Sequence, residues 1–347
     1  MGKIIDISFL IPTFNSDKTI VRTLTSIRQQ SYPQEKIEIL LIDGGSTDQT
    51  IQLARRFNCK IFKNLKTDIM AAEAIGYSKA KGRYVVFIAP DEVLEKRHSI
   101  ELKYKAIQSN PLIKAVLPSG YKTPKDYSPI NYYINEFGDP FSYFMYRDSK
   151  GYEYLARDLE KKYGVFYKYK DYLIFSFSKS KQLPLIELWA GGCMVDLEYV
   201  KSNFPQIKNK PELIPLIFYL LNNKGLLLAV TKNDPTVHYS VNSVGKYLKK
   251  IRSRIEYNIY LTPMGKGGFS GRENFESSFS RVKKFLFIPY SYSLVFPLID
   301  SVYLTLTRKK LIYLLHLPLC LYTASLIIYY YLLKLFRIEH AIKLYGH

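Results

Sequence analysis

Short unbroken runs of apolar residues alternate with amphipathic segments in the first quarter of the chain. The runs at 4–11, 37–42, 60–62 and 84–88 have the pattern of strands that are buried on both faces. The segments at 16–30, 47–57 and 69–80 have the spacing of amphipathic helices, and Ser16 or Asp17 is expected to cap the first. This alternation predicts βαβ units and an α/β fold built on a parallel sheet.

The pattern changes between residues 120 and 185. This stretch is rich in Tyr, Phe and Lys and has no clean period. Two interpretations stay open: a long insertion whose aromatic side chains pack on the main sheet, or a surface that contacts an acceptor or lipid. Regular patterns return with a helix expected over 212–223, a strand over 226–230, and Thr236–His238. We therefore expect one domain over 1–240, with the insertion at 120–185.

The last hundred residues have a different pattern. Residues 246–257 place five cations around apolar positions, as in a basic amphipathic helix. Residues 285–307 carry a single charge, on Asp300. Residues 311–333 carry none unless His316 is protonated, and about 20 apolar residues suffice to cross a bilayer. We expect residues 241–347 to be membrane-associated helices.

How such a tail meets a membrane is constrained by the basic clusters beside both apolar segments. A spanning hairpin, or a single span over 311–333, would place one cluster outside, against the positive-inside tendency. Helices lying in the interface, or a re-entrant pair interrupted at Pro289, Pro297 and Pro318, keep every cluster on the cytoplasmic side. We favour this arrangement, with a true span as the alternative. A helical pair buried in a soluble core is the third possibility.

The charge of the chain is uneven. The 50 Lys and Arg exceed the 30 Asp and Glu, which gives +20. Residues 241–347 hold 16 basic and 5 acidic residues, so +11 of the excess lies beside the apolar segments. This placement favours an anionic membrane as partner and disfavours nucleic acid. The three cysteines have no CxxC spacing and the N-terminus begins as a strand, so we expect no disulfides and no signal peptide.

Two loops at strand ends carry residues suited to binding a nucleotide. Ile11-Pro12-Thr13-Phe14-Asn15 closes the first strand, and Asp43-Gly44-Gly45-Ser46-Thr47-Asp48 closes the second. A carboxylate there can accept hydrogen bonds from a nucleobase or ribose, and glycines let a ligand approach the backbone. The next helix N-terminus favours anions.

With Gln30-Ser31-Tyr32-Pro33 between them, these motifs resemble the family 2 glycosyltransferases, over about residues 4–92 and more weakly to 240. The resemblance implies a GT-A fold, Rossmann-like with a mixed, mainly parallel sheet flanked by helices, and a nucleotide-diphospho-sugar donor. It places Thr13 and Asp43 where the family holds the base and ribose. The implied donor-site residues are Pro12, Thr13, Asn15, Asp43, Gly44 and Ser46.

The family's metal motif is altered in this chain. Where a D-x-D is usual, the sequence has Ala89-Pro90-Asp91, followed by Glu92. The resemblance implies that Asp91 and His238 hold Mg²⁺ or Mn²⁺ at the donor diphosphate, with Asp91 counted as catalytic, while Glu92 is a possible substitute for the missing Asp. A buried structural histidine is the alternative for His238.

The acceptor side follows the family less closely. Glu212 is the nearest match to the general base, although a helix-capping glutamate would look the same. Gly191 and Gly192 match the small residues that form the acceptor floor. Ala72-Glu73 stands where the family usually has Arg or Lys followed by Asn, so a donor contact is lost or moves to Lys66 or Asp68.

Together these patterns predict an inverting glycosyltransferase at the cytoplasmic face of the membrane. It would use a lipid-linked or surface-glycan acceptor in the synthesis of a cell-envelope polysaccharide. The chain lacks the Q-x-x-R-W of processive synthases, which favours transfer of single sugars. Transfer directly onto a polyprenyl phosphate, and a non-catalytic GT-A scaffold at the membrane, are the alternatives.

Overall fold

The computed structural model describes residues 5–66, 68–260, 272–275 and 277–338, and the chain forms two compact units. The first unit comprises residues 1–124, 150–180 and 186–239, and the second comprises 125–149, 181–185 and 240–347. The chain leaves the first unit for the last time after Tyr239. Residues 125–149, which we had placed in the N-terminal domain, lie instead with the C-terminal segment.

A nine-stranded mixed sheet organises the first unit, in the order β3-β2-β1-β4-β10-β6-β11-β9-β8. Strands β3, β2, β1 and β4 are parallel neighbours and β11 is parallel to β6, whereas β10 runs antiparallel between β4 and β6. A second sheet has the order β5-β12-β7. The strands are β1 Ile7–Thr13, β2 Ile37–Asp43, β3 Lys60–Lys63, β4 Tyr84–Phe87, β5 Glu92–Leu94, β6 Ile113–Leu117, β7 Tyr121–Lys122, β8 Tyr167–Lys168, β9 Tyr172–Phe175, β10 Cys193–Asp196, β11 Leu227–Thr231 and β12 Thr236–His238.

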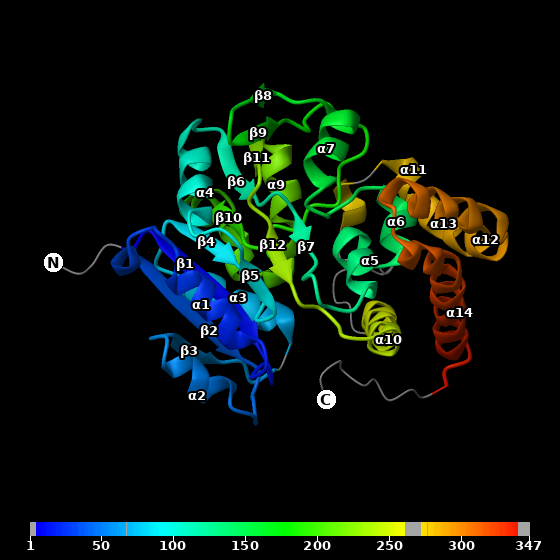
Figure 1. Cartoon of the computed structure of the whole chain (residues 1–347), viewed down its shortest axis with the longest axis horizontal. Helices are drawn as coiled ribbons and strands as arrows, with labels where there is room; N and C mark the ends of the chain where they lie inside the picture. The colour runs from blue at the N-terminus through cyan, green and yellow to red at the C-terminus, as the bar shows by residue number, and fades with distance from the viewer. Residues whose placement is uncertain (1–4, 67, 261–271, 276, 339–347) are drawn as a thin grey trace. The chain divides into compact units, whose positions relative to one another are not determined.

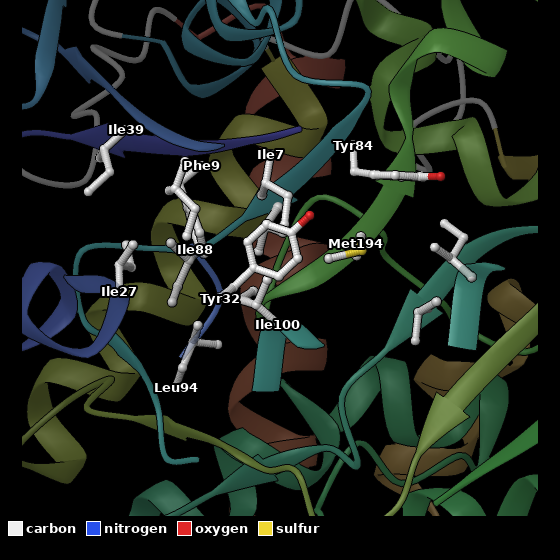
Figure 2. Packing of buried hydrophobic residues seen from close by; sticks show 14 of the residues in the cluster. Ile7, Phe9, Ile27, Tyr32, Ile39, Tyr84, Ile88, Leu94, Ile100 and Met194 are labelled. Atoms are coloured by element: carbon white, nitrogen blue, oxygen red, sulfur yellow. The ribbon is translucent and has the colours of Figure 1, made fainter. Parts of the chain in front are cut away.

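Helices cover both faces of the large sheet. Ile27 of α1 and Ile100 of α4 pack with Phe9, Ile88 and Met194 on one face (Figure 2). Helix α3 lies on the other face, where a Cβ on Gly76 would come within 2.9 Å of Leu10 Cδ1. The helices of this unit are α1 Ile20–Arg28, α2 Thr50–Arg55, α3 Ile69–Lys79, α4 Ser99–Gln108, α7 Leu155–Tyr163, α8 Leu197–Asn203 and α9 Ile217–Asn223, with the 3-10 segments η1 Gln34–Lys36, η2 Pro205–Lys208 and η3 Pro211–Leu216.

The predicted fold class is confirmed, one local prediction is wrong and another is confirmed only in part. Helix α1 begins at Ile20, and neither Ser16 nor Asp17 caps it with a side chain. Their backbone N–H groups instead donate to Thr50 Oγ1 (2.7 Å) and Asp48 Oδ2 (3.1 Å), because the segment is held against the second strand-end loop. The expected helix over 212–223 begins as the 3-10 segment η3, since Pro215 lacks the N–H that an α-helix needs there.

The second unit is helical (Figure 1, with α12 to α14 in orange to red). Its elements are α5 Ile130–Phe137, α6 Pro140–Tyr146, α10 Val244–Tyr260, α11 Ser278–Lys283, α12 Phe287–Tyr292, α13 Val295–Arg308 and α14 His316–Leu335, with η4 Arg272–Phe275, η5 Lys284–Leu286 and η6 Leu311–Leu315. Tyr133, Phe137, Tyr143 and Tyr247 are in its core. Part of the aromatic-rich insertion therefore packs in this unit rather than on the sheet.

The breaks between the C-terminal helices differ from those expected. Pro289, Pro297 and Pro318 do not interrupt helices. Each is the third residue of its helix, where a missing N–H costs no hydrogen bond. The break falls at Leu294, which has a φ of 59°. There the helical segments 278–292 and 295–308 meet at 88°.

By length and composition, one helical segment among the described residues could cross a membrane. Leu311–Leu335 has 25 residues with a mean hydropathy of 2.0 in its most apolar window, of which 39% is buried inside the protein. The bent pair formed by 278–292 and 295–308 would be a second candidate if it were one span.

Candidate active site

The ends of β1 and β2 bring the first two motifs together. The two strands are parallel and in register, with Thr13 beside Asp43, and Gly44 N–H donates to the Thr13 carbonyl at 2.8 Å. In an open α/β sheet, ligands bind at the carboxyl ends of the strands. The predicted donor residues thus occupy the edge where a ligand is expected.

The Asp43 carboxylate organises its own turn. It accepts hydrogen bonds from Gly45 N–H (3.0 Å) and Ser46 N–H (3.1 Å) at Oδ2, and from Ser46 Oγ (2.5 Å) at Oδ1. Gly45 has a φ of 95°, a conformation that glycine adopts without a steric penalty. Asp43 therefore fixes the loop that faces the ligand edge.

Asn15 ties the two loops to each other. Its N–H donates to Ser46 Oγ (2.9 Å) and its Oδ1 accepts from Thr47 N–H (2.9 Å). The residue has a φ of 44°, in the left-handed region that Asn tolerates better than most residues. These hydrogen bonds consequently join the two strand-end loops into a single unit.

Thr13 carries an unused hydrogen-bonding group at the centre of this structure. Its side chain is buried, and Oγ1 has no hydrogen-bond partner in the protein. A buried hydroxyl without a partner costs free energy, of the order of 1–3 kcal/mol, which a ligand group can recover. The neighbouring Pro12 is half-buried.

Asp91 and His238 form the second group of predicted residues. Asp91 follows β4 and His238 ends β12, and Asp91 Oδ2 lies 3.5 Å from His238 Nε2. The backbone links them further, because Tyr239 N–H donates to the Asp91 carbonyl at 2.9 Å. Their proximity was expected from the resemblance alone, since 147 residues of sequence separate them.

Glu92, the possible substitute for the missing aspartate, is held in place by the protein itself. Its side chain is buried and accepts from Ala89 N–H (2.8 Å), Gly191 N–H (3.1 Å) and Tyr121 Oη (2.9 Å). Burial raises the pKa of this carboxyl, and the negative charge of Asp91 acts in the same direction. Glu92 joins the loop of Asp91 to that of Gly191, and it lies opposite His238 in the antiparallel pair of β5 and β12.

The glycines of the expected acceptor floor are needed by the protein itself. Gly191 and Gly192 have φ values of 66° and 76°. A Cβ at Gly191 would lie 2.9 Å from Tyr121 Oη, and one at Gly192 would lie 2.9 Å from Leu94 Cδ2. We had attributed the small residues to the space that a sugar needs, but packing on β5 and β7 already accounts for them.

The donor set at Asp91 fits a divalent cation only in part. Among the described residues, no three His, Cys, Asp or Glu side chains are grouped so that they could hold a metal ion. Asp91 and His238 offer one oxygen and one nitrogen, a mixed pair that suits Mn²⁺ better than Mg²⁺. Further ligands would have to come from the donor diphosphate or water.

Glu212 is not joined to these residues by any contact in the described part of the chain. It lies half-buried in η3, which packs against α3. Lys66 and Asp68 were the other expected sites of a moved donor contact. Asp68 caps α3 by accepting from Ala71 N–H at 3.0 Å, a structural role that the sequence pattern did not predict.

Two further residues have buried polar atoms that the sequence interpretation did not predict. Trp189 packs against Phe87 in a tilted arrangement, with 4.5 Å between ring centroids, and its buried Nε1 has no partner. Glu73 lies on α3 with an unpartnered Oε2, and burial, followed by the charges of Asp68 and Glu187, raises the pKa of this carboxyl to about 8. The sequence offers one signal for each residue: Trp189 is the single tryptophan, and Glu73 is an acid within a mostly apolar helix.

Cys193 is excluded as a nucleophile by its surroundings. It begins β10 beside Gly192 and is buried. Burial raises the pKa of its thiol to about 12, so the side chain is protonated at physiological pH.

Comparison with known proteins agrees with this geometry. Two curated relatives are similar over short stretches. Poly(ribitol-phosphate) beta-N-acetylglucosaminyltransferase TarS of Staphylococcus aureus is 32% identical over 97 residues, covering 26% of this chain and 17% of TarS. A dolichyl N-acetyl-alpha-D-glucosaminyl phosphate 3-beta-D-2,3-diacetamido-2,3-dideoxy-beta-D-glucuronosyltransferase of Methanococcus voltae is 31% identical over 120 residues, covering 32% of this chain and 37% of that protein. The chain thus matches well under two thirds of either relative.

A solved structure shows the same fold over nearly the whole chain. The mannosyltransferase PcManGT of Pyrobaculum calidifontis, in complex with GDP-Man and Mn²⁺, has a TM-score of 0.52 and 13% identity, covering 97% of this chain and 88% of that one. The family model for glycosyl transferase family 2 matches residues 8–182, half of the chain. This chain therefore belongs to glycosyl transferase family 2 and has the GT-A fold.

Proposed function

We propose that this protein is an inverting glycosyltransferase that takes a sugar from a nucleotide-diphospho-sugar and transfers it to a lipid-linked or surface-glycan acceptor at the cytoplasmic face of the membrane. One observation carries the proposal: the Thr13–Asp43 loops and the Asp91–His238 pair follow β1, β2 and β4, which are adjacent parallel strands. A nucleotide at the first group would present its diphosphate to the second.

The two groups have different tasks in this reaction. The nucleoside would occupy the strand-end loops, where the Thr13 hydroxyl is available to it and Asp43 holds the loop in shape. Asp91 and His238 would hold Mn²⁺ or Mg²⁺ together with oxygens of the donor diphosphate. A cation bound there supplies positive charge that neutralises the departing diphosphate.

Deprotonation of the acceptor hydroxyl requires a base on the face opposite the leaving group. Glu212 stays the predicted base. An acidic side chain at the start of η3 has the required chemistry, and η3 packs against α3, the helix that follows the donor edge.

The acceptor class rests on the relatives and on the C-terminal segment. TarS is named for poly(ribitol-phosphate), and the Methanococcus protein for a dolichyl-linked phosphate sugar. Both names describe polymer- or lipid-linked acceptors. The basic and apolar second unit supports such an acceptor here, because a lipid-linked substrate is presented at a membrane surface.

The non-catalytic scaffold keeps support from a specific observation. Ala89 removes one carboxylate of the motif, and the Glu92 carboxylate, opposite His238 on the neighbouring strand, already accepts three hydrogen bonds from the protein. A protein of this kind would bind nucleotide at the strand-end loops without turning over the donor.

Turnover of a nucleotide-sugar donor distinguishes the glycosyltransferase from the non-catalytic scaffold. Purified full-length protein is incubated with UDP-, GDP-, dTDP- and CMP-sugars and Mn²⁺, and sugar release or transfer is measured. We expect turnover of one donor class, and a loss of at least about a hundredfold in Asp91→Asn because the charge at the diphosphate is removed. The surface variant Glu198→Gln is the matched control and should retain wild-type rates. Nucleotide binding without any turnover would favour the scaffold.

Thr13→Val tests the donor site separately from catalysis. The substitution removes the unpartnered hydroxyl with little change in volume, so the protein should be as stable as the wild type or more so. Nucleotide affinity, measured by isothermal titration calorimetry, should fall about tenfold, the effect of one lost hydrogen bond. Unchanged affinity would remove Thr13 from the donor site.

A further inference from the structure

The polarity of α13 is inverted relative to a helix on the surface of a water-soluble protein. Asp300 and Ser301 face inward and are buried. Seven apolar or aromatic residues are exposed on the outer side of the same helix: Val295, Phe296, Leu298, Ile299, Val302, Tyr303 and Leu306. Contiguous exposed apolar surface of this kind marks a site of association with a partner or a membrane.

The polar side of α13 is held inward by specific bonds within the second unit. Asp300 accepts from Tyr290 Oη of α12 and forms an ion pair with Arg147. Ser301 Oγ accepts from Leu317 N–H at the start of α14 (3.0 Å). At the end of α13, Arg308 Nε donates to the buried Glu136 at 2.7 Å. These contacts prevent α13 from rotating its apolar side into the protein.

The charges around this apolar surface indicate what it contacts. Arg281, Lys283 and Lys284 precede α12, and Lys309 and Lys310 follow α13. The exposed Tyr292 and Tyr303 are of the residue type enriched at membrane interfaces. Cations on both sides of an apolar helix face complement an anionic bilayer surface.

Helix α14 is long enough to span, but its neighbour makes a span costly. Helix α10 runs beside it: Tyr322 Oη donates to the Leu248 carbonyl (3.4 Å), and Lys334 Nζ donates to the Ile259 carbonyl (2.8 Å). Between these points, Tyr330 Oη donates to Glu256. Helix α10 carries five cations, Lys246, Lys249, Lys250, Arg252 and Arg254. If α14 crossed the bilayer, α10 would carry these charges into the hydrocarbon, where each is expensive.

We propose that the second unit binds one leaflet of an anionic bilayer through the outer side of α11 to α13, with α13 lying in the membrane plane, and that no helix of the described residues crosses the membrane. The proposal deepens the proposed function and rests on it only for its biological meaning, which is to hold the enzyme beside lipid-linked acceptors. The 14 residues of α13 are about 21 Å long, too short to cross the roughly 30 Å hydrocarbon core.

Vesicle flotation tests the binding surface without donor or acceptor. Full-length protein should float with phosphatidylcholine vesicles that contain about 30% phosphatidylglycerol, and less with phosphatidylcholine alone. The double variant Ile299→Glu/Leu306→Glu should bind these vesicles more than about tenfold more weakly, because two apolar side chains no longer enter the lipid. Leu112→Glu, at a 49% exposed position of the first unit, is the control for an added surface charge and should float as the wild type.

A second measurement distinguishes one-leaflet binding from a span. Lys309→Cys and Arg337→Cys, each in a Cys59→Ser background, are placed before and after α14, and sealed vesicles carrying the protein are treated with a membrane-impermeant maleimide. Both positions should react to the same extent before and after the vesicles are opened. Protection of either cysteine until opening would overturn the in-plane arrangement, and wild-type flotation of the double variant would overturn the surface.

Nucleotide binding to the first unit is the control for folding in each variant. Loss of flotation with unchanged nucleotide binding supports the proposal. Failure of the membrane proposal would leave the donor-turnover experiment unaffected, because that assay uses soluble nucleotide-sugars.

Discussion

Helices α1 and α13 are both amphipathic, and they bury opposite sides. In α1 the buried residues include Ile20, Leu24 and Ile27, which pack on the sheet. In α13 the buried residues include Asp300 and Ser301 beside Leu304, while seven other apolar or aromatic residues are exposed. A periodic pattern therefore shows that a helix has two sides, but not which side faces the protein. The surrounding solvent decides that, and the proposed solvent for α13 is lipid.

The two units also differ in the partners of their buried charged side chains. In the first unit, Lys103 of α4 forms a buried ion pair with Asp234. In the second unit, buried acids recur at the helix contacts, and Glu136, Glu256 and Asp300 each accept hydrogen bonds from tyrosines of other helices. Polar contacts join the helices of the second unit, as expected where apolar surface is turned outward.

The largest expected effect comes from breaking the buried ion pair of the first unit. Lys103 is fully buried, and its Nζ donates to Asp234 Oδ2 at 2.7 Å. Lys103→Met leaves the Asp234 charge buried without its partner and should lower the free energy of unfolding by about 3–5 kcal/mol. Urea unfolding in detergent micelles can be followed by fluorescence of Trp189, the single tryptophan, which reports on the first unit.

The matched control is Lys105→Met on the same helix. Lys105 is largely exposed, at 3.7 Å from Asp171, and its loss should change the free energy of unfolding by less than about 1 kcal/mol. The double variant Lys103→Met/Asp234→Leu should recover much of the loss, since both charges are then removed. Equal stability of Lys103→Met and Lys105→Met would show that the ion pair is not needed.

An identical substitution on α1 and α13 tests the comparison directly. Leu24 is 0% exposed and Leu298 is 49% exposed. Leu24→Ala should cost about 2–5 kcal/mol because it leaves a cavity in a packed core. Leu298→Ala should change stability by less than about 0.5 kcal/mol in detergent. Trp189 fluorescence measures the first effect, and hydrogen exchange of α13 and α14 peptides measures the second.

Similar costs for the two leucine variants would contradict the inverted polarity of α13. The same outcome would be expected if its outer side were covered by protein. The comparison thus separates a lipid-facing helix from a core helix without reference to any membrane.

The first unit was largely predictable because its strands are continuous apolar runs. Residues 7–13, 37–43 and 84–87 are strands close to where the pattern placed them. The antiparallel insertion of β10 and the assignment of residues 125–149 to the second unit were not predictable, since both depend on pairing between distant segments. Hydrophobic periodicity carries no information of that kind.

The sequence predicted which residues lie at the candidate site but not which hydrogen bonds they make. The motifs named Thr13, Asp43 and Asp91, and the structure brings each to one edge of the sheet. Sequence could not show that Glu92 turns inward to Gly191 and Tyr121, because an acid beside a metal motif looks the same in either orientation. Only its hydrogen-bond partners distinguish a metal ligand from a side chain that holds two loops together.

Glu73 provides the smallest expected effect and the one with a defined pH dependence. Its carboxyl is buried with Oε2 unpartnered, and burial raises its pKa from an ordinary value of 4.5 to about 8. The folded state therefore holds a proton that the unfolded state releases above pH 4.5. Stability from this group is complete below pH 4.5 and is lost as pH rises towards 8. The slope is at most about 1.4 kcal/mol per pH unit.

Glu73→Gln keeps the shape of the side chain and removes the titration. The variant should lose less stability than the wild type between pH 6 and pH 7, by about 1 kcal/mol, in urea unfolding followed by Trp189 fluorescence. Glu198→Gln, at an exposed acid of the same unit, should follow the wild type at both pH values. A wild-type slope in Glu73→Gln would mean that the carboxyl is charged in the folded protein, and hence that it has a partner or solvent that the structure does not give it. The difference in pH slope between Glu73→Gln and the wild type can also be measured with nucleotide present. If nucleotide abolishes this difference, Glu73 contacts the donor, because a ligand that reaches α3 changes the proton affinity of this buried acid.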